Sequence, residues 1–246
     1  MSKTVVLVIR ARDAFSDKLI ESGFEVINLE LLRVVAIEGG VDLSSEGLKG
    51  LDGLFFTSPH AAERFLEVFE GKRTSFDGDI YVLGHRTRDL FDRAGITVRY
   101  QSQANTAAEM ITLFGEAEFA GKRLLYIRGD KSMRTIPDLL SGIADIRELV
   151  VYKTVPITPD QQLISLVKRK LGEGGISWAC FFSPSGVDSL LDQIDVDKLK
   201  GVRTAVIGDT TARSARKAGF NVELISSRAK ADDFAAQLTE HIKNIA

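Results

Sequence analysis

An internal repeat constrains the fold of this chain more than any other feature. Three segments occur twice, in the same order and at nearly the same spacing: Leu-Val-Ile-Arg at 7–10 and Leu-Tyr-Ile-Arg at 125–128, Phe-Thr-Ser-Pro-His-Ala at 56–61 and Phe-Phe-Ser-Pro-Ser-Gly at 181–186, and Val-Leu-Gly-His-Arg-Thr at 82–87 and Val-Ile-Gly-Asp-Thr-Thr at 206–211. The period of about 120 residues far exceeds the roughly 20–50 residues of solenoid repeats, so each copy is the size of a domain. We therefore expect two similar lobes that face each other, with a ligand between them.

The composition fits one large or two small globular domains: of the 246 residues, 44% are apolar and 27% are charged. Because 32 basic and 34 acidic residues leave a net charge of −2, no overall basic field points to a nucleic acid or a membrane, and an anionic ligand needs a local cluster of cations. No secretory signal and no apolar run of roughly 18 residues is present, so we expect a cytoplasmic protein. The single cysteine, Cys180, lies in an apolar run that predicts a buried, inert thiol.

Short β-branched runs alternate with longer segments of helical periodicity, which predicts β–α units around parallel sheets. The expected strands include 5–9, 25–32, 53–57, 80–83, 123–127, 146–152, 178–182 and 204–207. Extended stretches at Val34–Glu38 and Lys153–Ile157 follow strands of matching rank in the repeat and are the expected junctions. The predicted fold class is α/β, with two flavodoxin-like or Rossmann-like lobes.

Four expected strand-to-helix turns carry small or hydroxylated residues, among them Ser58, Thr87, Ser183 and Thr211. Unpaired backbone N–H groups and the helix dipole let such helix starts bind carboxylates or phosphates. The carboxyl ends of parallel strands share one edge of a sheet, so these turns should converge there. The alternative is that each hydroxyl only caps its own helix.

Basic residues beside these turns support an anionic ligand. Arg10 follows the first strand, Arg128 follows the repeat of that strand, and Arg86 precedes Thr87. Each of the three could equally be a solvated surface charge.

Other chemistries have little support in the sequence. The chain contains neither G-x-G-x-x-G nor a Walker A sequence, so we expect no nucleotide cofactor. His60, His85 and His241 lack the spacing of metal ligands, and no G-x-S-x-G elbow surrounds Ser58. We expect neither a cofactor nor a metal.

Taken in order, these elements resemble uroporphyrinogen-III synthase, the cosynthase of tetrapyrrole biosynthesis, over essentially the whole chain. Seven short motifs carry the resemblance: a first strand ending in Arg10, Phe-Thr-Ser-Pro at 56–59, the strand, Gly and Thr of 82–87 with Gly95 behind the helix, Arg128-Gly129, Val151-Tyr152, 181–187 and 207–212. Two places depart from the family pattern. Leu31-Leu32-Arg33 stand where a proline is often found, and Lys131-Ser132-Met133 replace the usual glycine after Arg128-Gly129.

The resemblance implies two α/β lobes of parallel sheet joined by a two-stranded linker. The first lobe would combine residues 1–34 and 155–246, the second would be 37–152, and the linkers would lie near 34–37 and 152–155. It also implies cyclisation of linear hydroxymethylbilane to uroporphyrinogen III, with inversion of ring D and loss of water, on the route to heme, siroheme or cobalamin.

The same resemblance implies roles for individual residues. Tyr152 would be the proton donor, the alternative being a strand aromatic that packs at the hinge. The eight carboxylates of the substrate would be bound by a set of basic and hydroxylated residues: Arg10, Ser58, Arg86, Thr87, Arg128, Ser183, Ser185 and Thr211. We expect a monomer that makes transient contact with hydroxymethylbilane synthase. A rival interpretation from another class is a non-catalytic two-lobed module that binds a tetrapyrrole or another anion.

Overall fold

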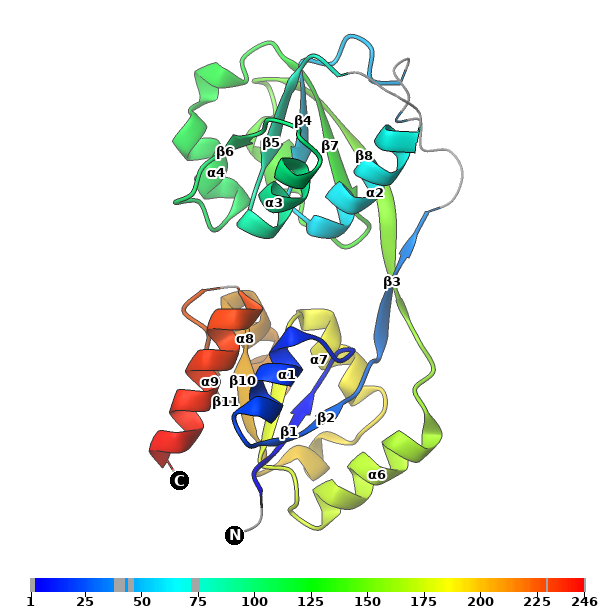
Figure 1. Ribbon diagram of the computed structural model, residues 1–246, viewed down its shortest axis with the longest axis vertical. Coiled ribbons are helices and arrows are strands. Elements are labelled where there is room, and N and C mark those ends of the chain that lie inside the picture. The colour runs from blue at the N-terminus through cyan, green and yellow to red at the C-terminus, as the bar shows by residue number, and fades with distance from the viewer. Residues whose placement is uncertain (1–2, 38–42, 44–46, 72–75, 229, 246) are drawn as a thin grey trace. The chain divides into compact units, whose positions relative to one another are not determined.

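A computed structural model describes residues 3–37, 43, 47–71, 76–228 and 230–245 (Figure 1). Contacts divide the chain into two compact units, which we call unit 1 (Met1–Arg33 with Pro156–Ala246) and unit 2 (Val34–Val155). Within the described residues no helix is both long and apolar enough to cross a membrane.

Unit 1 contains a sheet with the strand order β11-β10-β9-β1-β2, and every neighbouring pair is parallel. Its strands are β1 (Val5–Val8), β2 (Glu25–Asn28), β9 (Trp178–Phe181), β10 (Arg203–Val206) and β11 (Asn221–Ile225). Its helices are α1 (Ala14–Glu21), α6 (Gln161–Gly172), α7 (Pro184–Leu191), α8 (Asp209–Lys217) and α9 (Ala231–Ile245), with a 3₁₀ turn, η2, at Val196–Leu199.

The central strands of unit 1 are continuous apolar runs because helices cover both faces of the sheet (Figure 1). Successive side chains of a strand point to opposite faces. Val5 and Leu7 accordingly pack with buried residues of α6, α7 and α8, whereas Val6 and Val8 pack with those of α1 and α9. Cys180 is fully buried in the second of these cores, which confirms the predicted structural thiol, and burial raises its pKa.

Unit 2 contains a sheet with the strand order β3-β8-β7-β4-β5-β6. Its strands are β3 (Leu32–Ala36), β4 (Gly53–Phe56), β5 (Asp79–Val82), β6 (Arg99–Tyr100), β7 (Arg123–Gly129) and β8 (Asp145–Pro156). Its helices are α2 (Pro59–Gly71), α3 (His85–Arg93), α4 (Ala107–Phe114) and α5 (Thr135–Leu139), with a 3₁₀ turn, η1, at Glu116–Glu118. The side chains of β4 again point alternately to the two faces of the sheet, where there are two separate cores. Leu54 and Phe56 pack with α2 and α3, and Phe55 packs with α4 and α5.

Strands β3 and β8 both run across the boundary between the units, and their ladder is antiparallel. The Ile37 N–H donates to Val151 O and the Ile157 N–H donates to Leu31 O, so residue numbers rise on one strand as they fall on the other. The expected strand at 25–32 is shorter in the structure: β2 ends at Asn28, and Leu32 begins β3. Residues 152–155, expected as a linker, continue β8 without a break, and Glu38 of the other expected junction lies outside the described residues.

The repeated segments occupy matching positions in the two sheets. Strand β1 has the rank of β7, β9 that of β4, and β10 that of β5. The sequence copies and the compact units nevertheless do not coincide. Unit 1 combines β1 and β2 of the first copy with β9–β11 of the second, and the sheet of unit 2 combines β3–β6 of the first copy with β7 and β8 of the second. The predicted α/β class with two similar parallel-sheet lobes is therefore confirmed, and all the predicted turns lie at the carboxyl ends of the parallel strands.

Candidate functional site

Two tyrosine hydroxyls meet two side-chain hydroxyls at the carboxyl edge of the unit 2 sheet. Tyr152 on β8 donates a hydrogen bond from Oη to Ser58 Oγ over 2.9 Å. The Oη of Tyr126 on β7 and the Oγ1 of Thr57 lie 2.8 Å apart. Tyr126 is buried, and this burial raises its pKa, whereas Tyr152 is only half-buried and keeps contact with solvent.

His60, in the first turn of α2, lies beside Tyr152. The two ring centroids are 5.7 Å apart in an edge-on arrangement. His60 Nδ1 is 3.1 Å from Glu63 Oε2, and the histidine is exposed.

The start of α3 in unit 2 offers backbone donors without a side-chain cap. Its N-cap is Gly84, whose φ of 81° lies in the left-handed region that glycine adopts readily. Thr87, in the first turn, is 1% exposed, and its hydroxyl has no hydrogen bond to another described residue. Arg86 is exposed, and His85 Nδ1 lies 3.2 Å from Tyr100 Oη.

The start of α8 in unit 1 has the same construction. Its N-cap is Gly208, which has extended backbone and no side-chain cap. Thr211 is 3% exposed, and it too lacks a hydroxyl hydrogen bond within the described part of the chain. Side chains cap α1, α4, α6 and α7, whereas α3, α5 and α8 begin without a side-chain cap, and of these three α3 and α8 have a glycine at the N-cap.

The two Ser-Pro turns serve different purposes. Ser183 caps α7, because its Oγ accepts a hydrogen bond from the Gly186 N–H at 3.1 Å. The Oγ of Ser185 lies 3.1 Å from the Oγ of Ser183. Ser58 instead accepts the hydrogen bond of Tyr152. Ser183 therefore acts as a helix cap, as the alternative interpretation predicts, whereas the Oγ of Ser58 contacts Tyr152.

The three predicted arginines have different surroundings. Arg10 pairs with Asp13 Oδ2 at 2.9 Å and lies over the Phe182 ring, with 4.3 Å from Cζ to the centroid. Arg86 is exposed. Arg128 has a side chain only 13% exposed: its Nε lies 2.7 Å from Glu148 Oε2, and its Nη1 donates to backbone carbonyls of the following turn.

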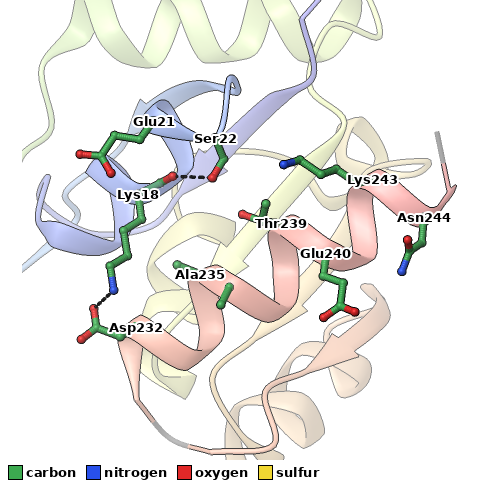
Figure 2. A pocket seen from close by; sticks show the side chains of 10 residues that line it. Lys18, Glu21, Ser22, Asp232, Ala235, Thr239, Glu240, Lys243 and Asn244 are labelled. Atoms are coloured by element: carbon green, nitrogen blue, oxygen red, sulfur yellow. Dashed lines mark hydrogen bonds and ion pairs between the residues drawn. The ribbon is translucent and has the colours of Figure 1, made fainter.

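A groove lies between α1 and α9 on unit 1, with a volume of about 650 Å³ (Figure 2). Cations and anions alternate along it, and Lys18 Nζ lies 2.8 Å from Asp232 Oδ1. It contains none of the predicted site residues, and its mixed charge does not favour a substrate with many carboxylates. The described residues include no group of three or more His, Cys, Asp or Glu able to hold a metal.

Sequence reasoning missed the Thr57–Tyr126 pair, although the repeat contains a signal for it. The two copies differ at these two positions: Thr57 corresponds to Phe182, and Tyr126 corresponds to Val8. Unit 2 has two hydroxyl-bearing residues where unit 1 has two apolar residues at matching places of the sheets. Comparing the copies position by position would have singled out both residues.

Comparisons with known proteins agree with one another. The model of the family described as uroporphyrinogen-III synthase HemD matches residues 13–236. A uroporphyrinogen-III synthase of Chlorobaculum parvum is 27% identical over 198 residues, which are 78% of this chain and 80% of that protein.

Solved structures show the same fold at low identity. The synthase of Helicobacter pylori aligns with a TM-score of 0.67 and 16% identity, covering 98% of this chain and 100% of that one. A mutant synthase of Thermus thermophilus aligns with a TM-score of 0.66 and 14% identity, covering 98% and 99%.

Proposed function

Since the chain belongs to the uroporphyrinogen-III synthase family, we infer that it is a cyclising lyase of tetrapyrrole biosynthesis, which converts hydroxymethylbilane to uroporphyrinogen III. The match of the family over residues 13–236 carries this conclusion. The site supports it, because carboxyl-edge turns with unpaired N–H groups suit a substrate that bears eight carboxylates.

We assign the binding of carboxylates first to the two glycine-capped helix starts. Each offers first-turn N–H groups, the positive end of a helix dipole and a threonine hydroxyl, at Thr87 and at Thr211, that has no hydrogen bond to the part of the chain that the structure describes. Arg86 and Arg10 lie at the same edges of their sheets and add positive charge. Ser185 and Ser183 flank the start of α7 and complete the proposed set in unit 1.

We assign the role of proton donor to Tyr152. Its phenol donates a proton as the substrate hydroxyl leaves, so that the hydroxyl departs as water and a pyrrole nitrogen supplies the electrons for a cationic azafulvene. The terminal pyrrole attacks through its substituted carbon, and the spiro intermediate fragments and recloses with ring D inverted. The carbon of ring D that has formed the new bond then loses its proton. Return of a proton to the phenolate restores Tyr152.

Because the pyrroles supply the electrons, positioning and exclusion of water account for most of the rate. The deciding experiment incubates the protein with hydroxymethylbilane and separates the product isomers, with a heat-denatured sample as the control. We expect the type III isomer. Formation of only the spontaneous type I isomer would favour the non-catalytic binding module instead.

A further inference from the structure

Strand β8 changes register against β7 where it delivers Tyr152. Arg128 is opposite Val150, but Gly129 is opposite Tyr152, so β8 contains one extra residue at this point. Val151 and Tyr152 are consecutive, yet both pack against the same core of unit 2. Such a bulge re-aims a side chain, and bulges are frequent next to active sites.

Gly129 leaves the space that the Tyr152 ring occupies. A Cβ at residue 129 would lie 2.3 Å from Tyr152 Cζ, 2.4 Å from Cε2 and 2.6 Å from Oη. Carbon atoms in contact are about 3.5–4.0 Å apart, so any side chain here would displace the ring by roughly 1 Å or more. The φ of Gly129 is not in the left-handed region, so the position needs glycine for room and not for its backbone conformation.

The backbone of Gly129 is held from several sides and cannot retreat easily. Arg128 Nη1 donates to Gly129 O at 3.0 Å and to Ser132 O at 2.9 Å. The Gly129 N–H donates to Ser132 Oγ at 3.2 Å, and the Asp130 N–H donates to Tyr152 O at 3.0 Å. A substituent at residue 129 therefore moves the tyrosine and not the turn.

We propose that Gly129 is a positioning residue for Tyr152: the absence of a side chain at residue 129 fixes the phenol where its hydroxyl reaches Ser58. Gly129 itself touches no reacting atom. The inference rests on the proposed function for its effect on rate, but its structural core, the dependence of the Tyr152 position on Gly129, can be tested without any substrate.

The kinetic test is Gly129→Ala. A displacement of about 1 Å can cost up to roughly 100-fold, so we expect kcat to fall about 10- to 100-fold with KM little changed. In a Tyr152→Phe background the same substitution should lower kcat by no more than about 3-fold, since the hydroxyl on which it acts is already gone. Gly172→Ala is the matched control, because Gly172 is exposed at the end of α6 with nothing within 4 Å of the added Cβ. Equal losses of kcat in the two backgrounds would overturn the proposal.

The structural test uses isotope-labelled tyrosine and NMR, which is feasible because the chain has only 4 tyrosines. Gly129→Ala should shift the Tyr152 ring signal and leave that of Tyr81 in place; an unchanged Tyr152 signal would refute the inference. If the wild-type protein had no activity, only the proposed function would be refuted.

A stability cycle covers the case in which Gly129→Ala folds poorly. Tyr152→Ala removes the ring that a Cβ at residue 129 would meet. Gly129→Ala should therefore lower the midpoint of thermal unfolding in the parent and leave it nearly unchanged in Tyr152→Ala. The same loss in both backgrounds would mean that the turn itself needs glycine.

Discussion

The two units have the same strand order at their cores, but they fill matching positions with different chemistry. At the carboxyl edge of unit 2, Thr57 and Tyr126 share a hydrogen bond. At the matching places of unit 1, Phe182 packs against the core that contains Val8. All four tyrosines of the chain lie in unit 2, so only this unit can supply a phenol as a proton donor. The proposed binding turns therefore occur in both units, whereas the proposed proton donor can come from unit 2 alone.

The arginines after β1 and β7 show a second divergence. Asn28, opposite Val8, donates to Arg10 O and to Ser16 Oγ. The matching residue opposite Tyr126 is Glu148, whose carboxylate pairs with the Arg128 side chain. The carboxylate that stands in place of an amide pairs the second arginine with the neighbouring strand β8, and its Nη1 donates to the turn that follows β7. Repeated placement in the sequence therefore does not carry a role from one copy to the other.

Loss of the Tyr152 hydroxyl should have the largest effect. General acid catalysis contributes about 10²–10⁴-fold, so Tyr152→Phe should lower kcat within this range while the type III isomer still forms. Isomer-resolved assays measure the change. Tyr152→Ala serves as the comparison. If Tyr152→Phe kept the rate of the parent and only Tyr152→Ala lost activity, Tyr152 would be a packing residue.

Alanine at each of the paired arginines should separate structure from binding. Arg128→Ala leaves Glu148 with Arg134 alone, and we expect the free energy of unfolding to fall by about 2–3 kcal/mol. Arg10→Ala should cost less than about 1 kcal/mol and raise KM more than it lowers kcat. Denaturant titration and steady-state kinetics give the two quantities. Equal changes of unfolding free energy and of KM in the two variants would contradict different roles for Arg10 and Arg128.

The Thr57–Tyr126 pair should be coupled. Thr57→Val removes one partner of the buried Tyr126 hydroxyl, and Tyr126→Phe removes the partner of the half-buried Thr57 hydroxyl, so either change alone should cost about 1 kcal/mol of unfolding free energy. The double variant should cost no more than either single one, because it restores an apolar pair like that of unit 1. Strictly additive losses in denaturant titrations would show that the two hydroxyls act independently.

Salt should have the smallest effect. Carboxylate contacts at exposed edges are screened as the Debye length falls from about 10 Å at 0.1 M to 3 Å at 1 M, so KM should rise several-fold with ionic strength. In Arg86→Ala the rise should be shallower, since one exposed cation is missing. A KM independent of salt would argue against electrostatic capture of the carboxylates.

The α/β class and the positions of the four strand-to-helix turns could be predicted from the sequence, because buried parallel strands are apolar runs and helix starts carry recognisable residues. The break between β2 and β3 could not, since residues 25–36 contain no glycine or proline that would mark it. The partners of Ser58 and Arg128 also escaped, because they come from Tyr152 and Glu148 on β8. Side-chain pairing across strands depends on register, and the bulge at Gly129 shifts it.

The mismatch between sequence copies and compact units also has a consequence for folding during synthesis. Unit 2 is one contiguous stretch, whereas β1 at the centre of unit 1 pairs with β9, so Val6 must wait for Trp178. At about 5–20 residues per second the ribosome needs on the order of 10–30 s to make the intervening chain. The edge of β1 that faces β9 stays unpaired for that time, whereas the other edge can pair with β2 at once. An unpaired apolar edge can pair wrongly, and this edge stays open until the last third of the chain emerges.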